Sequence, residues 1–386
     1  MEQKQSKKIL AVIGTFESDI IAFYELIKEL VSLGHNVTCY VLQEFESKIK
    51  STGARLKTYV LDKINESRIP PALVKKAVVP LSIANSYIHI LDDALKSHEQ
   101  YDYLIVDSFY DGNEMNKILK IPTVIALYNN GLGEKSPFVE MSMVHRNHYW
   151  IPANKKFNIN IKDFLMQHFN PDAKYKLMLT TKMFQTEARK LDDSFFFIGP
   201  PFYERPIDNT FNFKKDEGKK LIYVSFGITF NESIDLYKMC IEAFGNSKEF
   251  QVIMSIGKKN NKQELGDIPE NISVYNYLPQ LQVLAMADVF ISHGGNNSIS
   301  EALSQFHLPL IVIPAVFAQE ENAKVIEKYE AGIVLDKDDL SPEVLKETVE
   351  TYLANKEKYL KGVDKIVQSF KEARDERKKV FEKIFG

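Results

Sequence analysis

The chain has 386 residues, with 49 lysine and arginine residues against 52 aspartate and glutamate residues, for a formal net charge of −3. This length suits two domains of ordinary size better than a single core. A nearly neutral chain lacks the strongly basic surface that is typical of nucleic-acid binding. We therefore expect two cores and no nucleic-acid partner.

The beginning of the chain has no feature of an export signal or a membrane anchor. Five apolar residues, Ile9 to Ile13, precede Gly14 and Glu17. Such a run is shorter than a signal-peptide core or a membrane span, so we expect a cytoplasmic protein with no membrane span. Cys39 and Cys240 lie in separate apolar segments. We expect both to be buried free thiols.

Short runs rich in valine, isoleucine and tyrosine alternate with helical patterns along the whole chain. This alternation is typical of parallel sheets with helices on both faces, so the predicted fold class is α/β with two Rossmann-like, doubly wound domains facing a cleft. The predicted strands are residues 9–14, 37–42, 103–108, 123–128, 221–227, 251–256, 272–275, 288–292 and 309–313.

Glycine, serine and proline residues at particular positions predict the helix ends and the domain boundary. Gly34 should end a helix over residues 20–33, and Ser341 followed by proline should begin another. The proline-containing, charged stretch 199–220 is typical of a linker. We predict an N-terminal domain over 1–210, a C-terminal domain over 211–358, and a last amphipathic helix over 359–386 that packs back on the N-terminal domain.

A segment in the second half predicts an anion site. The strand over 288–292 leads through His293 into Gly294 and Gly295, and a helix then opens with asparagine and serine. Glycines allow a close approach of the backbone to a ligand, and the first amides of a helix have no intrahelical partner. The simpler alternative is a capping box between Ser298 and Glu301, which would explain neither glycine.

The region from residue 129 to 174 has weak periodicity and many large side chains. Two interpretations stay open, a wall over an acceptor pocket and the ordinary packing of an irregular segment. The candidate acceptor-binding residues there are Phe138, Met141, His145 and Trp150.

Three further groups of residues accompany the glycine-containing segment. They are Tyr277-Leu-Pro-Gln280, Ile313-Pro314, and Gln319 with Asn322-Ala323. In order and spacing, the set resembles the nucleotide-sugar signature of the GT-B, family 1 glycosyltransferases, especially the bacterial macrolide-type branch that glycosylates small molecules.

The resemblance implies a role for each matching residue. Gln280 would meet the base, Glu301 the ribose hydroxyls and Gln319 the sugar. The diphosphate would lie against His293, Asn297 and Ser298. The other predicted donor-binding residues are Gly227, Thr229, Tyr277 and Gly295.

The chain departs from the family pattern at three places. Ile228 follows Gly227, so the hydroxyl of Thr229 comes one residue late, and Ala318 replaces the acidic residue that usually precedes Gln319. Asp19 stands where the family has its catalytic histidine, whereas Asp107 matches the aspartate that pairs with it. We predict Asp19 as the base beside Asp107; the alternative is that Asp19 only caps a helix beginning at Ile20.

No metal site or cofactor is predicted. Histidines and cysteines are scattered without ligand spacing, and the D-x-D within Asp336 to Asp339 is better explained as a solvated turn. No dinucleotide-binding or ATP-binding glycine motif is present in the sequence. The diphosphate would be stabilised by the helix start and His293.

These features predict a metal-independent, inverting glycosyltransferase that moves a sugar, preferentially glucose, from a UDP-sugar to a hydroxyl of an apolar small-molecule acceptor. Two alternatives stay open: a GT-B epimerase or hydrolase of nucleotide sugars, and a degenerate partner protein that keeps the nucleotide site but has lost its base. A monomer and a homodimer are both compatible with the sequence.

Overall fold

The computed structural model describes residues 6–14, 17–61, 86–107, 112–128, 173–185, 191–202, 205, 207–227, 234–258 and 260–386. The chain forms two compact units. Unit 1 comprises residues 1–180, 187–201 and 374–386, and unit 2 comprises residues 181–186 and 202–373. The predicted boundary near residue 210 falls within unit 2, shortly after the change of unit at residue 202. The assignment of the acceptor to one domain and the donor to the other stays a prediction.

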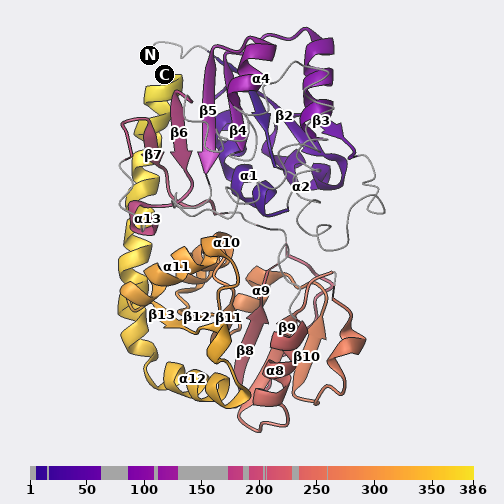
Figure 1. Ribbon diagram of the computed structural model, residues 1–386, viewed down its shortest axis with the longest axis vertical. Helices are drawn as coiled ribbons and strands as arrows, with labels where there is room; N and C mark the ends of the chain where they lie inside the picture. The colour runs from indigo at the N-terminus through magenta and orange to yellow at the C-terminus, as the bar shows by residue number, and fades with distance from the viewer. Residues whose placement is uncertain are drawn as a thin grey trace. The chain divides into compact units, whose positions relative to one another are not determined.

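Unit 1 contains a seven-stranded parallel sheet in the order β3-β2-β1-β4-β5-β6-β7. Its strands, indigo to magenta in Figure 1, are β1 (Lys8–Val12), β2 (Asn36–Leu42), β3 (Arg55–Tyr59), β4 (Tyr103–Asp107), β5 (Thr123–Tyr128), β6 (Tyr175–Met178) and β7 (Phe195–Phe197). The helices include α1 (Glu17–Ser32), α2 (Glu46–Ile49) and α4 (Gly112–Leu119).

Unit 2 contains a six-stranded parallel sheet in the order β10-β9-β8-β11-β12-β13. Its strands are β8 (Lys220–Ser225), β9 (Phe250–Ser255), β10 (Ile272–Tyr275), β11 (Val289–Ser292), β12 (Leu310–Val312) and β13 (Gly332–Val334). Its helices are α8 (Ile234–Phe244), α9 (Gln280–Leu284), α10 (Asn296–Phe306), α11 (Phe317–Lys328), α12 (Pro342–Ala354) and the first part of α13 (Lys356–Phe385).

The two parallel sheets confirm the predicted α/β fold class, and all nine predicted strands are present within two residues of their expected ends. Four further strands, β3, β6, β7 and β13, were not predicted. Both sheets change direction of strand order beside their first strand, β1 or β8. In open α/β sheets, ligands bind at the carboxyl ends of the strands at this point.

The predicted helix ends are confirmed at Gly34 and Ser341. Gly34 adopts φ +88°, its amide bonds to Val31, and the amide of His35 bonds to Leu30, which together close α1 with a left-handed cap. At the start of α12, the Ser341 hydroxyl accepts a hydrogen bond from the Val344 amide at 3.2 Å.

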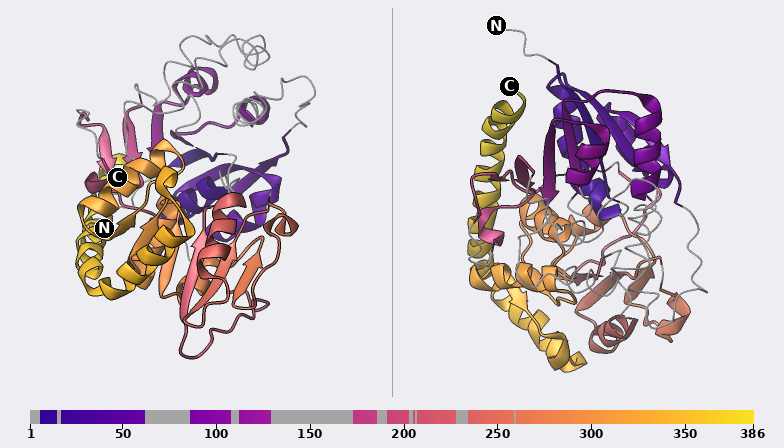
Figure 2. Two further views of the ribbon diagram at one scale, coloured as in Figure 1. Left: turned by 60° about the horizontal axis from the view of Figure 1, so that its bottom comes forward. Right: turned by 45° about the horizontal axis from the view of Figure 1, so that its top comes forward.

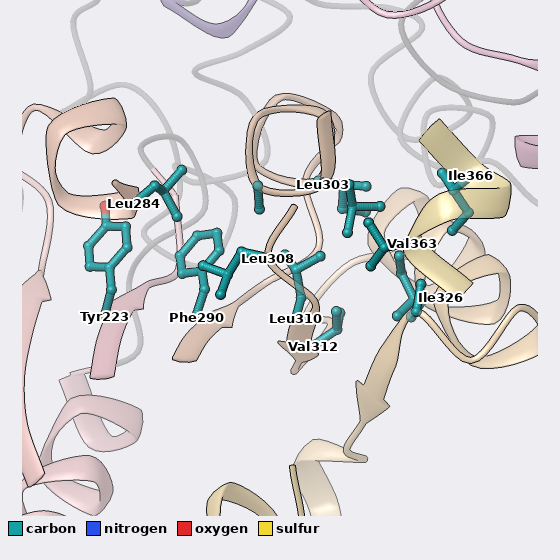
Figure 3. Packing of buried hydrophobic residues seen from close by; sticks show 14 of the residues in the cluster. Tyr223, Leu284, Phe290, Leu303, Leu308, Leu310, Val312, Ile326, Val363 and Ile366 are labelled. Atoms are coloured by element: carbon teal, nitrogen blue, oxygen red, sulfur yellow. The ribbon is translucent and has the colours of Figure 1, made fainter. Parts of the chain in front are cut away.

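The core of unit 2 packs around β8 and β11, the strands that lead into the candidate functional site. Tyr223 of β8 and Phe290 of β11 stack with ring centroids 4.8 Å apart. Figure 3 shows Leu284 of α9 and Leu303 of α10 near the same layer, and Ile326 of α11 beside Val363 and Ile366 of α13. These packed apolar side chains fix the positions of β8, β11 and α10 relative to one another.

The last residues of α13 pack within unit 1 through buried charges. The Arg377 side chain is 4% exposed, its Nε donates to the Ile198 carbonyl at 2.9 Å, and its Nη1 lies 3.3 Å from both Glu25 and Glu29. Arg374 Nη2 lies 2.6 Å from Glu25. This helix is one continuous segment and is drawn in yellow in Figure 2.

Two other expectations can be compared with the structure. Cys39 and Cys240 are both buried free thiols, as predicted. Among the described residues, no helix combines the length and the apolar character that crossing a membrane requires.

Candidate functional site

The turn between β11 and α10 presents an uncapped helix start. Gly294 adopts φ +79°, and Gly295 is the N-cap residue in an extended conformation without a side-chain capping bond. The first intrahelical bond joins the Ile299 amide to the Gly295 carbonyl at 3.0 Å. The amides of residues 296–298 therefore precede the helical bonding pattern, which is the arrangement that binds anions.

The imidazole of His293 lies between two glycines. A Cβ added to Gly227 would lie 2.7 Å from His293 Nε2, and one added to Gly295 would lie 2.6 Å from the same atom. Both distances are well inside van der Waals contact. Gly227 and Gly295 are therefore required here because only residues without side chains leave room for the ring.

Burial lowers the pKa of His293 to about 4, and the backbone of Ser225 offsets only part of this effect. The imidazole is therefore neutral near pH 7 and acts through hydrogen bonding instead of through charge. His293 Nδ1 and Asn296 Nδ2 are both buried without a hydrogen bond of normal geometry inside the described structure. Two buried nitrogens beside the helix start are thus available to a polar ligand.

Asn322 of α11 holds the turn at Gly294 and Gly295 through hydrogen bonds. Its Nδ2 donates to the Gly294 carbonyl at 2.9 Å and to Asn296 Oδ1 at 2.7 Å, and the residue is 3% exposed. These bonds cross from one helix to the beginning of another. They hold the first turn of α10 against β11 before any ligand is present.

Glu301 belongs to a buried polar network and does not close a capping box. Its Oε2 accepts from Gln280 Nε2 at 2.6 Å, and its Oε1 pairs with Arg205. Gln280 Oε1 in turn accepts from the Tyr223 hydroxyl at 3.2 Å. The capping alternative is therefore wrong, because Gly295 is the N-cap and both carboxylate oxygens of Glu301 have other partners.

Burial raises the pKa of Glu301 above its ordinary value, while the charge of Arg205 and the hydrogen bonds from Gln280 and Arg205 act in the opposite direction. An ionised carboxylate only accepts hydrogen bonds, whereas a protonated carboxyl loses one acceptor site to its own proton. The neighbours of Glu301 thus favour the form that can bind a diol.

Gln319 is oriented by backbone donors at the start of α11. Its Oε1 accepts from the Ala315 amide at 2.8 Å and from the Val316 amide at 3.2 Å. Because both partners are N–H donors, the oxygen of the carboxamide must face them, and the NH₂ group is left to donate elsewhere. Gln319 is therefore held with its NH₂ group as the remaining donor, and a sugar hydroxyl oxygen could accept from it.

The other described donor-site residues lie near these groups along the chain. Ser298 is buried in the first turn of α10, and Asn297 is half-buried beside it. Tyr277 follows β10 and is 51% exposed, so its ring is accessible to a planar ligand. The roles of all these residues stay predictions.

The two predicted catalytic carboxylates lie in unit 1, Asp107 at the end of β4 and Asp19 in α1, which follows the adjacent strand β1. Asp107 is the last residue of β4 and is 2% exposed, and β4 pairs directly with β1. Asp19 is 3% exposed, and its Oδ2 occupies the space that a Cβ on Gly14 would take. Because α1 begins at Glu17, Asp19 lies within the first turn, and the alternative that it caps a helix beginning at Ile20 is wrong.

Five predicted site residues fall outside the part of the chain that the structure describes. They are Thr229 of the donor site and Phe138, Met141, His145 and Trp150 of the acceptor site.

No cluster of three metal-ligating side chains occurs among the described residues. The D-x-D sequence forms a solvated 3₁₀ turn over Lys337–Asp339, in which Asp336 accepts from the Asp338 amide at 3.0 Å and no residue is buried.

Arg205 is a further candidate site residue, and no sequence pattern selects it. It stands in the linker, 96 positions before its partner Glu301, and its side chain is 20% exposed. No periodicity or local motif connects two residues so far apart. Only their burial in one network identifies the pair.

Known proteins share both the sequence pattern and the fold. Residues 229–377 match the model of the glycosyltransferase family 28 C-terminal domain. The chain is 30% identical over 380 residues to an uncharacterized UDP-glucosyltransferase, YojK, of Bacillus subtilis, covering 92% of this chain and 91% of that protein. It is 29% identical to the NDP-glycosyltransferase YjiC of the same organism, covering 90% and 89%.

A solved structure, the glycosyltransferase of kitacinnamycin, matches with a TM-score of 0.78 and 22% sequence identity, covering 99% of this chain and 100% of that one. At this identity the match supports the two-sheet architecture and carries no information about the substrate.

Proposed function

As a member of the bacterial macrolide-type group of GT-B glycosyltransferases, the protein is a nucleotide-sugar-dependent glycosyltransferase of small molecules, and we propose that it transfers glucose from UDP-glucose, with inversion, to a hydroxyl of an apolar acceptor. The proposed donor follows the names of the relatives, two of which are UDP-glucosyltransferases of Bacillus subtilis.

The observation that carries the proposal is the uncapped start of α10 beside the buried Glu301. A diphosphate would accept hydrogen bonds from the amides of residues 296–298, and a ribose diol would donate to the carboxylate of Glu301. The buried nitrogens of His293 and Asn296 would gain partners at the same time. One ligand, a nucleoside diphosphate sugar, has all of these groups in this order.

Catalysis would require one base and one stabilised leaving group. A base takes the proton of the acceptor hydroxyl as its oxygen forms a bond to the anomeric carbon, and the bond from that carbon to the diphosphate oxygen breaks. Attack from the face opposite the leaving group inverts the anomeric carbon. Asp19 is the proposed base and Asp107 its neighbour, and the helix start with the neutral His293 would stabilise the departing diphosphate.

A transfer assay with a panel of sugar nucleotides and aromatic or polyketide hydroxyl compounds tests the proposal. We expect UDP-glucose to give product of inverted configuration, detected by nuclear magnetic resonance of the new glycosidic bond. UDP released without any glycosylated product would instead identify a hydrolase. If UDP binds but neither release nor transfer occurs with any acceptor, the protein is a binding partner and the proposed activity is wrong.

A further inference from the structure

An arginine of the predicted linker pairs with the carboxylate that would bind the ribose of the donor. Arg205 pairs with Glu301 Oε1, and Gln280 holds Glu301 Oε2 at 2.6 Å. The carboxylate of Glu301 is almost fully buried, with 4% of its side chain exposed. Both of its oxygens are therefore oriented by protein donors from two different segments.

The number of acceptor positions left on Glu301 matches a vicinal diol. A carboxylate has about four lone-pair sites, two on each oxygen. Arg205 and Gln280 each use one of these sites, on different oxygens. One site remains on each oxygen, so two adjacent hydroxyl groups can donate at once, whereas a deoxyribose can use only one of them.

We propose that Arg205 is a positioning residue that selects a ribonucleotide donor by holding the carboxylate of Glu301 oriented toward the 2′- and 3′-hydroxyls. This inference rests on the proposed role of Glu301 as the ribose acceptor. Arg205 acts through Glu301 and needs no contact with the reacting atoms. Its planar guanidinium suits this task because its direction is fixed, unlike the point charge of a lysine.

The charge of Arg205 should make the effect of its removal on UDP affinity depend on pH, which a role in packing alone would not do. Burial raises the pKa of Glu301, and Arg205 opposes that rise. Without Arg205 the carboxyl would be protonated at higher pH, and a protonated carboxyl loses an acceptor site to its own proton. The loss of ribose affinity should therefore grow as the pH is lowered.

Calorimetric titration with UDP and with 2′-deoxy-UDP tests the proposal on the whole protein. We expect the wild type to prefer UDP by about tenfold, the value of one hydrogen bond to a charged group. Arg205→Met should remove most of this preference, weakening UDP binding by about tenfold and 2′-deoxy-UDP binding far less. Arg205→Lys, which keeps the charge, should recover part of it.

The controls separate this proposal from the proposed function. Arg55→Met removes an exposed arginine of unit 1, which pairs with Glu99, and should change neither affinity. If Arg205→Met weakens both nucleotides equally, or shows no pH dependence, the arginine is structural and the inference is overturned. If the wild type does not discriminate and Glu301→Gln binds UDP normally, the ribose role of Glu301 itself fails.

Discussion

The two units differ in side-chain charge at a turn between a strand and a helix: one first turn is acidic and the other is uncharged. In unit 1, α1 follows β1 and carries Glu17 and Asp19 in its first turn. In unit 2, α10 follows β11 and has no acidic residue in its first turn, only asparagines and a serine. Acidic residues complement the positive end of a helix dipole and leave nothing for an external anion. The same fold therefore gives one unit a candidate base and the other a candidate phosphate site.

The fourth strands of the two sheets show the same contrast. β4 ends in the buried Asp107, whereas β11 ends in Ser292 followed by His293. Each of these strands lies beside the first strand of its sheet, β1 or β8. Equivalent positions in two parallel sheets thus carry a carboxylate in one case and a neutral imidazole in the other.

The largest effect should come from removing the charge of the proposed base. Asp19→Asn keeps the size of the side chain and its contact with Gly14. We expect kcat to fall by about 10²- to 10⁴-fold, the usual contribution of a general base, while UDP affinity stays within about twofold. Steady-state kinetics at saturating UDP-glucose, with calorimetry for UDP, measure the two quantities. A variant with nearly full kcat would exclude Asp19 as the base.

Giving α10 the charge of α1 should destroy the phosphate site. Asn297→Asp places a carboxylate in the first turn, where it would repel a diphosphate and weaken UDP binding by about 100-fold. The same change should slightly stabilise the helix, by about 0.3–1 kcal/mol. Uridine, which has no phosphate, is the control ligand, and its affinity should not change. Equal losses for UDP and uridine would show that the diphosphate lies elsewhere.

The neutral His293 should make unit 2 sensitive to acid. Its folded pKa of about 4 lies below the unfolded value of 6.5, so the unfolded chain binds the extra proton first. The contribution of His293 to the free energy of unfolding is fully present above pH 6.5. It falls as the pH is lowered toward 4, by about 2 kcal/mol at pH 5. Urea unfolding of wild type and His293→Gln at pH 5 and pH 7.5 measures this. The variant should lose less stability than the wild type over that interval.

A smaller effect on UDP affinity is expected from adding a methyl group next to the imidazole of His293. Gly295 has an ordinary φ of −68°, so an alanine would not strain the backbone there. Only the 2.6 Å distance between the added Cβ and His293 Nε2 opposes Gly295→Ala. We expect UDP affinity to fall by about tenfold as the ring is displaced. Gly266→Ala is the matched control, since Gly266 has a positive φ but open space around it. That control should lower stability without changing UDP affinity; normal UDP binding by Gly295→Ala would argue against a role for His293.

The sequence identified the central strands of both sheets because they are buried on both faces. β8 and β2 read as nearly continuous apolar runs, and this is the pattern that a covered parallel strand must have. The missed strands interrupt this pattern or are too short to show it. β3 contains Arg55 and Lys57, β6 contains Lys176, and β7 and β13 have three residues each. Because β3, β7 and β13 lie at sheet edges, where strands are often short or charged, periodicity did not detect them.

The candidate donor site was predictable from the sequence where its residues are close together along the chain. The turn from His293 to Ser298 carries its own evidence, because the glycines, the asparagines and the helix start are contiguous. Arg205 was missed since its only connection to the site is spatial. The first turn of α1 was placed too late, because Glu17 and Ser18 precede the apolar residues that define the helical pattern.

The last helix imposes an order on the biosynthesis of the protein. α13 begins within unit 2, and its final residues, from Arg374 onward, complete unit 1. A ribosome therefore synthesises all of unit 2 before it makes the guanidiniums that pair with Glu25 and Glu29. Although the synthesis of unit 1 begins first, unit 1 cannot be completed until the last residues of the chain have been made.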